Sequence, residues 1–166
     1  SVEGSATKLS DETYPLGEIV KYEFPARGPH PPVTLTWYDG GLKPPRPPEL
    51  EPDEDLRDVL YVGEAGKLMG DRLLPDAKFE KFVRPAKSLP RSPGHQQEWV
   101  AACRGGTPAG SNFADHAGLL TEVCLLGNIA VRSGRKLLWD APNLRFTNDP
   151  NATKRLHRDY RAGWTL

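Results

Sequence analysis

Two histidines open the two most apolar helical segments of the sequence, and they are the residues best suited to polar chemistry. His95 begins one segment and His116 begins the other. A helix amino end favours a neutral imidazole, which can donate or accept a hydrogen bond. Arg91 precedes the first segment and Asn112 precedes the second. We therefore predict that these groups converge on one polyol or carboxylate ligand. The sequence favours the alternative, in which each imidazole only forms hydrogen bonds within the first turn of its helix.

Aromatic side chains offer a second way to hold a sugar, since an aromatic ring can stack on its apolar face while a polar edge stays wet. Trp164, close to the end of the sequence, joins the candidates for substrate contact on this ground. Trp37 and Trp99 are open to two interpretations, sugar stacking or burial in the core, and the sequence favours the core. The aromatic residues considered are Trp37, Tyr38, Trp99, Tyr160 and Trp164.

The stretch YVGEAGKLMG, residues 61–70, has glycines and a lysine in an order that suggests a phosphate-binding loop. Such a loop requires a glycine five residues before Gly66, where Tyr61 stands, and a hydroxyl residue after Lys67, where Leu68 stands. Pro75 also follows too soon for a long helix to point its amino end at an anion. The stretch therefore predicts a hairpin, with Gly63 and Gly66 supplying positive φ angles.

Other site patterns are missing from the sequence. There is no Gly-x-Gly-x-x-Gly turn, no Gly-x-Ser-x-Gly elbow and no Cys-x-x-Cys pair. Asp53, Asp55 and Glu64 match part of a calcium loop, but Asp58 replaces its required glycine. Cys103 and Cys124 lie among apolar neighbours and are predicted to be buried thiols. We therefore assign no catalytic, cofactor-binding or metal-binding residue.

Composition limits the partners. The 166 residues contain 22 Lys plus Arg and 22 Asp plus Glu, so the net charge gives no general attraction to nucleic acid or an anionic membrane. No apolar run is long enough to span a bilayer. The 17 prolines predict long irregular connections. Because Ser1–Lys8 includes no initiator Met, we expect the natural amino terminus to lie upstream.

Residue periodicity predicts an α+β fold. Strands are expected at 17–26, with Val20, Tyr22 and Phe24 on one face, and at 32–38, with Val33, Leu35 and Trp37 on one face. A proline-rich segment at 42–52 is expected to be an extended connection, with docking to a groove-bearing partner as the weaker alternative. Further elements are expected as a hairpin at 60–70, helices at 95–104, 115–133 and 150–160, and short strands at 137–140 and 144–147. The helix at 115–133 is apolar over most of its circumference, which predicts burial on several sides. We expect one domain, 1–166, with a mostly antiparallel open β-sheet and helices packed on one face.

Several stretches together resemble the carboxy-terminal part of the Gfo/Idh/MocA oxidoreductases, relatives of glucose–fructose oxidoreductase and inositol dehydrogenase. They are TYPLGEIVKYEFPARG, PPVTLTWYDGGLKPPRP, LPRSPGHQQEWVAACRGGTPAGSNF, LLTEVCLLGNIAVRSGRKLLWDAPNLRFTN and YRAGWTL. The resemblance implies a bacterial two-domain enzyme that transfers a hydride at a sugar or polyol carbon, with NAD or NADP held by an amino-terminal Rossmann domain. It also implies a carboxy-terminal domain that covers the substrate and builds a homo-oligomer.

The sequence departs from that family in one important respect. No Rossmann domain is present, and neither is the family's Asp-x-x-x-His motif or its Glu-Lys-Pro motif, since Leu42 precedes Lys43-Pro44. We therefore expect a substrate-covering and oligomerisation domain that is inactive alone and binds no cofactor itself. The alternative is a free-standing carbohydrate-binding or assembly module without redox activity. The compartment, bacterial cytoplasm or periplasm, stays open.

Overall fold

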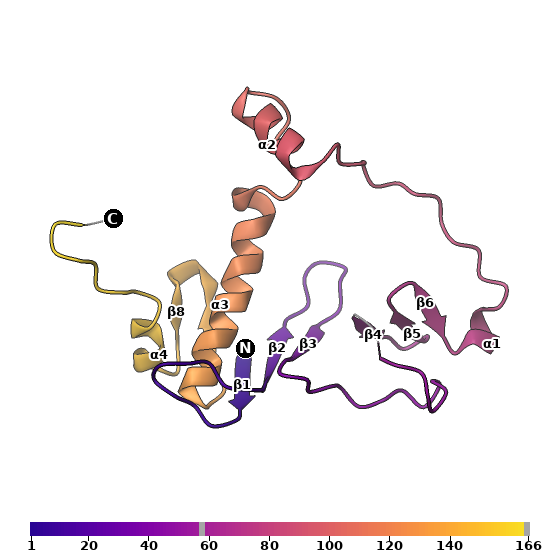
Figure 1. Ribbon diagram of the computed structural model, residues 1–166, viewed down its shortest axis with the longest axis horizontal. Helices are drawn as coiled ribbons and strands as arrows, with labels where there is room; N and C mark the ends of the chain where they lie inside the picture. Colours follow the sequence, from indigo (N-terminus) through magenta and orange to yellow (C-terminus); the bar gives the residue numbers. More distant parts are fainter. Residues whose placement is uncertain (57–58, 165–166) are drawn as a thin grey trace. The chain divides into compact units, whose positions relative to one another are not determined.

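The computed structural model describes residues 1–56 and 59–164 (Figure 1). The sequence predicts one domain over 1–166; in the structure the chain divides into two compact units. Unit 1 consists of Ser1–Leu42 with Ser92–Leu166, and unit 2 is Lys43–Arg91. Asp58 of the partial calcium pattern and the tail residues Thr165 and Leu166 lie outside the described residues.

The α+β prediction is confirmed, and all the strand pairs described are antiparallel. The strands form three small sheets, ordered β1-β2-β3, β4-β5-β6 and β7-β8. The main sheet of unit 1 contains β1 (Val2–Ala6), β2 (Glu18–Phe24) and β3 (Val33–Tyr38). The last two match the predicted strands, whereas β1 was missed.

One face of this sheet carries the core of unit 1. Strand pairing places Val20 opposite Trp37 and Tyr22 opposite Leu35, so these side chains share one face. Helix α3 (Gly118–Ser133) covers that face over β1 and β2 and buries Val20 and Tyr22. The core cluster consists of Val2, Val20, Tyr22, Leu126, Ala130, Val131, Leu137, Phe146 and Ala152.

The predicted helix 115–133 is present but is buried over only part of its length. A π-helical turn, η1 (Phe113–Ala117), precedes α3, and Gly134 ends the helix in a left-handed conformation, as the sequence predicts. The buried residues of α3 all come from its second half, Leu126, Gly127, Ala130 and Val131. The prediction of burial on several sides is therefore wrong for the first half, because no described element lies over it.

The predicted burial of four side chains is also wrong. Trp37 is 58% exposed because α3 does not extend over β3, and Trp99 is 67% exposed on α2 (His95–Cys103). Helix α2 itself has no buried residue. Cys103 on α2 and Cys124 on α3 are both free and exposed thiols.

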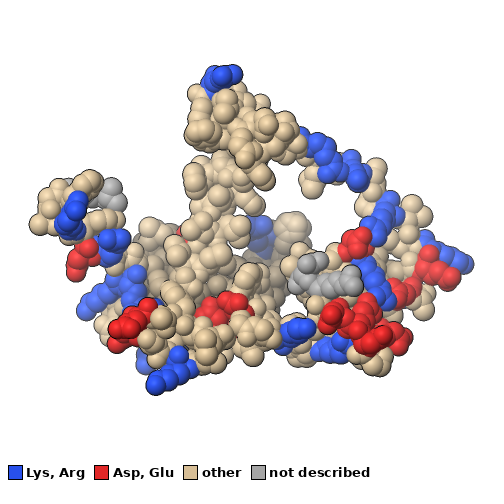
Figure 2. All heavy atoms as spheres, in the orientation of Figure 1, with Lys and Arg blue, Asp and Glu red and all other residues tan. Residues whose placement is uncertain are grey.

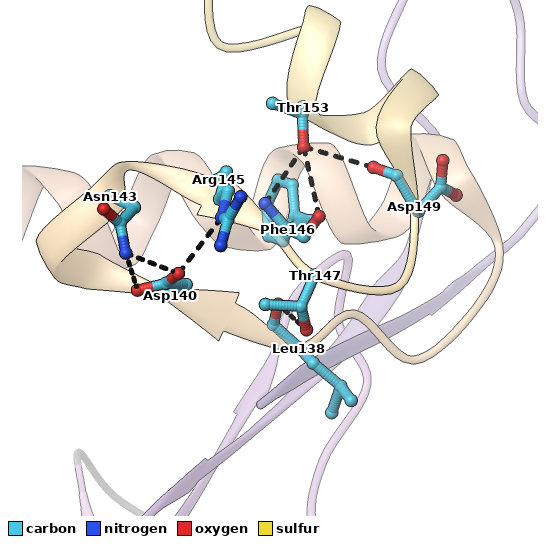
Figure 3. Close-up of polar contacts among 8 residues, drawn as sticks. All are labelled: Leu138, Asp140, Asn143, Arg145, Phe146, Thr147, Asp149 and Thr153. Carbon is cyan, nitrogen blue, oxygen red and sulfur yellow. Dashed lines mark hydrogen bonds and ion pairs between the residues drawn. The ribbon is translucent and has the colours of Figure 1, made fainter.

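After α3 the chain forms a short hairpin closed by side-chain hydrogen bonds (Figure 3). Strand β7 (Trp139–Asp140) pairs with β8 (Arg145–Phe146) across a 3-10 turn, η2 (Ala141–Asn143), as predicted for two short strands. The Asp140 carboxylate accepts hydrogen bonds from Asn143 and Arg145, which lower its pKa. Helix α4 (Pro150–Lys154) follows and is shorter than the predicted 150–160 helix.

Unit 2 is a small sheet with its own core. Strands β4 (Leu60–Val62), β5 (Lys67–Met69) and β6 (Arg72–Leu74) pair in sequence order, followed by the short helix α1 (Asp76–Phe79). The hairpin prediction is thus confirmed, although Gly63 does not have a positive φ and Gly70 does, at 58°. Leu50, Met69 and Leu74 form the core.

The proline-rich segment contributes to this unit. Pro47 is buried, and Leu50 belongs to the unit 2 core. Residues that pack inside their own unit are not free to enter a groove on a partner. The structure therefore favours the structural interpretation of the 42–52 segment over the docking one.

We expect Gly4→Ala to destabilise unit 1 by roughly 1–3 kcal/mol, because a methyl group there overpacks the sheet–helix contact. A Cβ atom built on Gly4 would lie 2.6 Å from the backbone nitrogen of Val131 and 2.7 Å from its Cα. Urea denaturation followed by circular dichroism measures the change in unfolding free energy. Ser5→Ala, an exposed neighbour on the opposite face of β1, is the control and should change stability by less than about 0.5 kcal/mol. Equal stability of both variants would contradict the close contact.

We also expect unit 1 to lose stability in acid through Glu23. Lys136, then Ser1 and Lys21, donate hydrogen bonds to its carboxylate and lower its pKa from 4.5 to about 2. Because the folded state favours the charged form, this stabilisation is complete above pH 4.5 and is lost as the pH falls toward 2. Denaturation across that range should show a flatter profile for Glu23→Gln. Glu12→Gln, in an exposed loop, should keep the wild-type profile.

Candidate functional site

The predicted site residues lie mainly along residues 92–117, where a loop folds back on the first turn of α2. The Glu98 carboxylate on α2 accepts a hydrogen bond from the Gly110 backbone nitrogen at 3.2 Å. Hydrogen bonds from Ser92 and then from Gly110 lower the pKa of Glu98, so it is held as a carboxylate. Glu98 thus connects the entry of α2 with the loop that leads to Asn112.

Asn112 uses its side chain to build the turn that follows. Its Oδ1 accepts from the Asp115 nitrogen at 2.9 Å, and its Nδ2 donates to the Ala109 carbonyl at 3.2 Å. Its own carbonyl accepts from the backbone nitrogens of His116 and Ala117. The amide is therefore an amino-terminal cap for η1. A role in substrate contact stays a prediction, and it would have to use the remaining hydrogen-bonding capacity of this amide.

The two histidines are exposed. His95 is the first residue of α2 and lies one turn from Glu98, and His116 lies in η1. Glu98 and Asn112 link the local structures that carry these imidazoles, but among the described residues no hydrogen bond or ion pair joins the two rings to each other. Convergence of both imidazoles on one ligand therefore stays a prediction.

The other two candidates lie elsewhere. Arg91 is exposed and is the last residue of unit 2, whereas His95 and His116 belong to unit 1. Trp164 is an exposed residue of the carboxy-terminal tail, with the Arg161 guanidinium 5.2 Å from its ring centre. A cation over one ring face leaves the opposite face open for stacking. His30 and His157 are both exposed, consistent with the interpretation that they are solvated.

The strongest feature of this region is its exposed apolar surface, which we call the α3 overhang: Phe113, Leu119 and Leu120. Leu119 lies on the same stripe as the buried Leu126 and Ala130, at spacings of seven and eleven residues. The stripe thus continues past the sheet, where Leu119 is 61% exposed, and Phe113 on the preceding π-helical turn is 84% exposed. Asp115 and Glu122 are the only charged residues between Arg104 and Arg132. In agreement, Figure 2 shows few charged atoms over α2 and the first half of α3 on the face drawn.

No group of three or more His, Cys, Asp or Glu residues in 1–56 and 59–164 lies close enough to hold a metal ion. A shallow, open hollow of about 420 Å³ on α2 is lined by Gln96, Gln97, Val100, Ala101 and Arg104. A second open hollow, of about 970 Å³ in unit 2, is lined by residues between Leu68 and Lys87. His95, Asn112, His116 and Trp164 line neither hollow.

Sequence reasoning missed Glu98 and the overhang. The signal for Glu98 was an acidic residue in the first turn of a helix, where it complements the helix dipole. The signal for the overhang was the length of the apolar stripe on this helix. The rest of the sequence offers too few apolar segments to cover the whole stripe.

The chain matches no protein-family model and no curated protein. The likeness to the Gfo/Idh/MocA oxidoreductases thus rests on the stretches quoted above. Among the residues that the structure describes, no helix is long and apolar enough to cross a membrane.

We expect Asn112→Ala to cost about 1 kcal/mol of folding free energy, because the Asp115 nitrogen loses its acceptor. Asn112→Asp keeps an acceptor oxygen at the same place and should retain most of the stability. Urea denaturation of the two variants measures the difference, with circular dichroism at 222 nm as the signal. If alanine and aspartate proved equally stable, the capping role of Asn112 would be wrong.

Proposed function

We propose that the chain is the substrate-covering and assembly domain of an oxidoreductase that uses NAD or NADP to oxidise or reduce a sugar or polyol. In this proposal the chain supplies binding surfaces, and a separate Rossmann domain supplies the cofactor and the catalytic groups. The proposal rests on the resemblance of the quoted stretches to the Gfo/Idh/MocA oxidoreductases. The antiparallel α+β fold is compatible with it.

The observation that carries the proposal is the α3 overhang. Apolar side chains that continue the core stripe of a helix gain stability when they are removed from water, at about 25 cal/mol per Å². No described element covers Leu119 and Leu120, so a partner surface can supply the missing cover. His116 lies on the turn directly before these leucines. A domain seated on the overhang would therefore enclose this imidazole next to the bound substrate.

The exposed aromatic residues favour a second candidate, a carbohydrate-binding module without redox activity. The sequence places Trp37 and Trp99 in the core, whereas both side chains are more than half exposed. Exposed tryptophans suit stacking on a sugar face. This candidate and the first differ in one respect: a binding module acts without a cofactor domain.

The first test asks whether the chain needs a partner for redox chemistry. We expect the purified 166-residue chain to show no nucleotide binding in calorimetry and no turnover of sugars or polyols with NAD or NADP. Turnover by this chain alone would contradict the proposal. Sugar binding without nucleotide, lost in Trp99→Ala, would favour the carbohydrate-binding module.

The second test addresses the partner. A dinucleotide-binding domain encoded by the same gene, produced separately, should bind the chain and restore activity. Leu119→Glu with Leu120→Glu should weaken this binding at least about tenfold, because charges would be buried without partners. Leu16→Glu, at an exposed leucine before β2, is the matched control and should not weaken it. A gene without such a domain, or binding that is indifferent to the Leu119 and Leu120 changes, would overturn the assignment.

A further inference from the structure

The turn that follows strand β3 contains a pair of residues that can react with each other. Asp39-Gly40 is the one place in the sequence where a glycine follows an aspartate or an asparagine. Glycine has no Cβ to shield its amide nitrogen, so this nitrogen can approach the side-chain carboxyl of the residue before it. Closure of a ring between the two groups gives a five-membered imide. The pair is therefore a candidate for covalent modification of the chain.

The structure holds the two reacting groups in contact. The Gly40 nitrogen lies 2.7 Å from Asp39 Oδ1 and donates a hydrogen bond to it. Among the residues that the structure describes, no other acceptor bonds this nitrogen, so nothing draws it away from the carboxyl. Groups that are held together in this way react as if their concentration were very high. Both residues are exposed, so water can take part in the reaction.

The backbone of the turn keeps a glycine at this position. The Leu42 nitrogen donates to the Asp39 carbonyl at 3.4 Å and closes the turn. Gly40 and Gly41 have φ angles of 68° and 80°, the pattern of a type I′ turn. A Cβ atom built on Gly40 would also lie 1.9 Å from the Leu16 carbonyl oxygen. A larger residue at position 40 would therefore disturb the turn, and the fold retains the reactive pair.

We propose that Asp39 is a site of spontaneous isomerisation to isoaspartate. The Gly40 nitrogen attacks Asp39 Cγ, so that an N–C bond forms and a C–O bond of the carboxyl breaks. The amide hydrogen and the carboxyl OH leave as one molecule of water, and a succinimide remains. Water then opens this ring at the former main-chain carbonyl of Asp39. Gly40 is left attached through Asp39 Cγ, which is the isoaspartyl linkage, and no oxidant or reductant is needed.

The modification would change the turn itself. An isoaspartyl linkage adds one methylene to the main chain and converts the Asp39 carbonyl, the acceptor for the Leu42 nitrogen, into a free carboxylate. The close contact between Gly40 and Leu16 leaves no room for a longer turn. The end of β3 should therefore loosen, and the new carboxylate should be accessible to an isoaspartyl methyltransferase that uses S-adenosylmethionine. This inference is independent of the proposed function.

The test is to age the full chain in neutral buffer for several weeks and to map isoaspartate along it. Electron-transfer fragmentation of its peptides locates the linkage, and methylation by an isoaspartyl methyltransferase counts it. We expect at least about tenfold more isoaspartate at Asp39 than at Asp11, an exposed aspartate of unit 1 that is followed by Glu12. Asp39→Glu keeps the charge but would have to close a six-membered ring, so it should give none. Asp39→Asn closes the same ring with loss of ammonia and should react faster than the wild type.

A synthetic peptide of residues 36–43 shows what the folded turn contributes. Because the contact is already formed in the folded chain, we expect Asp39 to isomerise there at least as fast as in the peptide. Isoaspartate in the peptide but not in the folded chain would overturn the proposal, because the turn would then protect the pair. Equal amounts at Asp39 and Asp11 would overturn it as well. Circular dichroism checks each variant, and if Asp39→Glu unfolds, the comparison of the wild type with the peptide decides.

Discussion

Unit 1 depends on the close approach of α3 to strands β1 and β2, and two glycines permit it. A side chain on Gly4 would collide with the backbone of Val131 on the helix. From the opposite direction, a Cβ on Gly127 would lie 2.0 Å from the Tyr22 hydroxyl oxygen. The contact seals Tyr22 under the helix, and this burial raises the pKa of its hydroxyl to about 12. A helix this near its sheet excludes water efficiently, but only over the area where small residues allow the approach.

The limited area of this helix–sheet contact determines which apolar surfaces of unit 1 stay exposed. Because the contact uses the second half of α3 and the first two strands, the first half of the helix and the third strand stay uncovered. Both uncovered parts are apolar for the same reason, since each continues a pattern that is buried farther along. The apolar side of β3 continues the row of Val20 and Tyr22, and Leu119 continues the stripe of Leu126. The exposed apolar area is thus an extension of the core, and it lies on two different elements, α3 and β3.

Sequence periodicity predicted most of the helices and strands correctly, but it did not predict which of their side chains are buried. Strands β2 and β3, the 60–70 hairpin and the helix ending at Gly134 follow from side-chain alternation, helical spacing and glycine position, which are local properties. Strand β1 was missed because its sequence, VEGSA, has one apolar residue of any size, and it is a strand by virtue of its pairing with β2. The exposure of Trp37 and Cys103 depends on which faces α3 and its neighbours reach, and no local pattern carries that information.

The candidate site illustrates how polar residues divide between structure and function. In the sequence, His95, Asn112 and His116 all lie at predicted helix starts. The first backbone amides of a helix lack partners within the helix, so polar side chains at a helix start are also needed to bond them. Asn112 meets this need for η1, whereas Glu98 accepts a hydrogen bond from the Gly110 amide in the loop before η1. The imidazoles do not meet this need, and they stay exposed beside apolar side chains. Capping by Asn112 therefore fixes the backbone that presents the exposed His116 ring. In the proposed function, this exposed imidazole would contact the substrate, and the reacting groups would come from the cofactor domain.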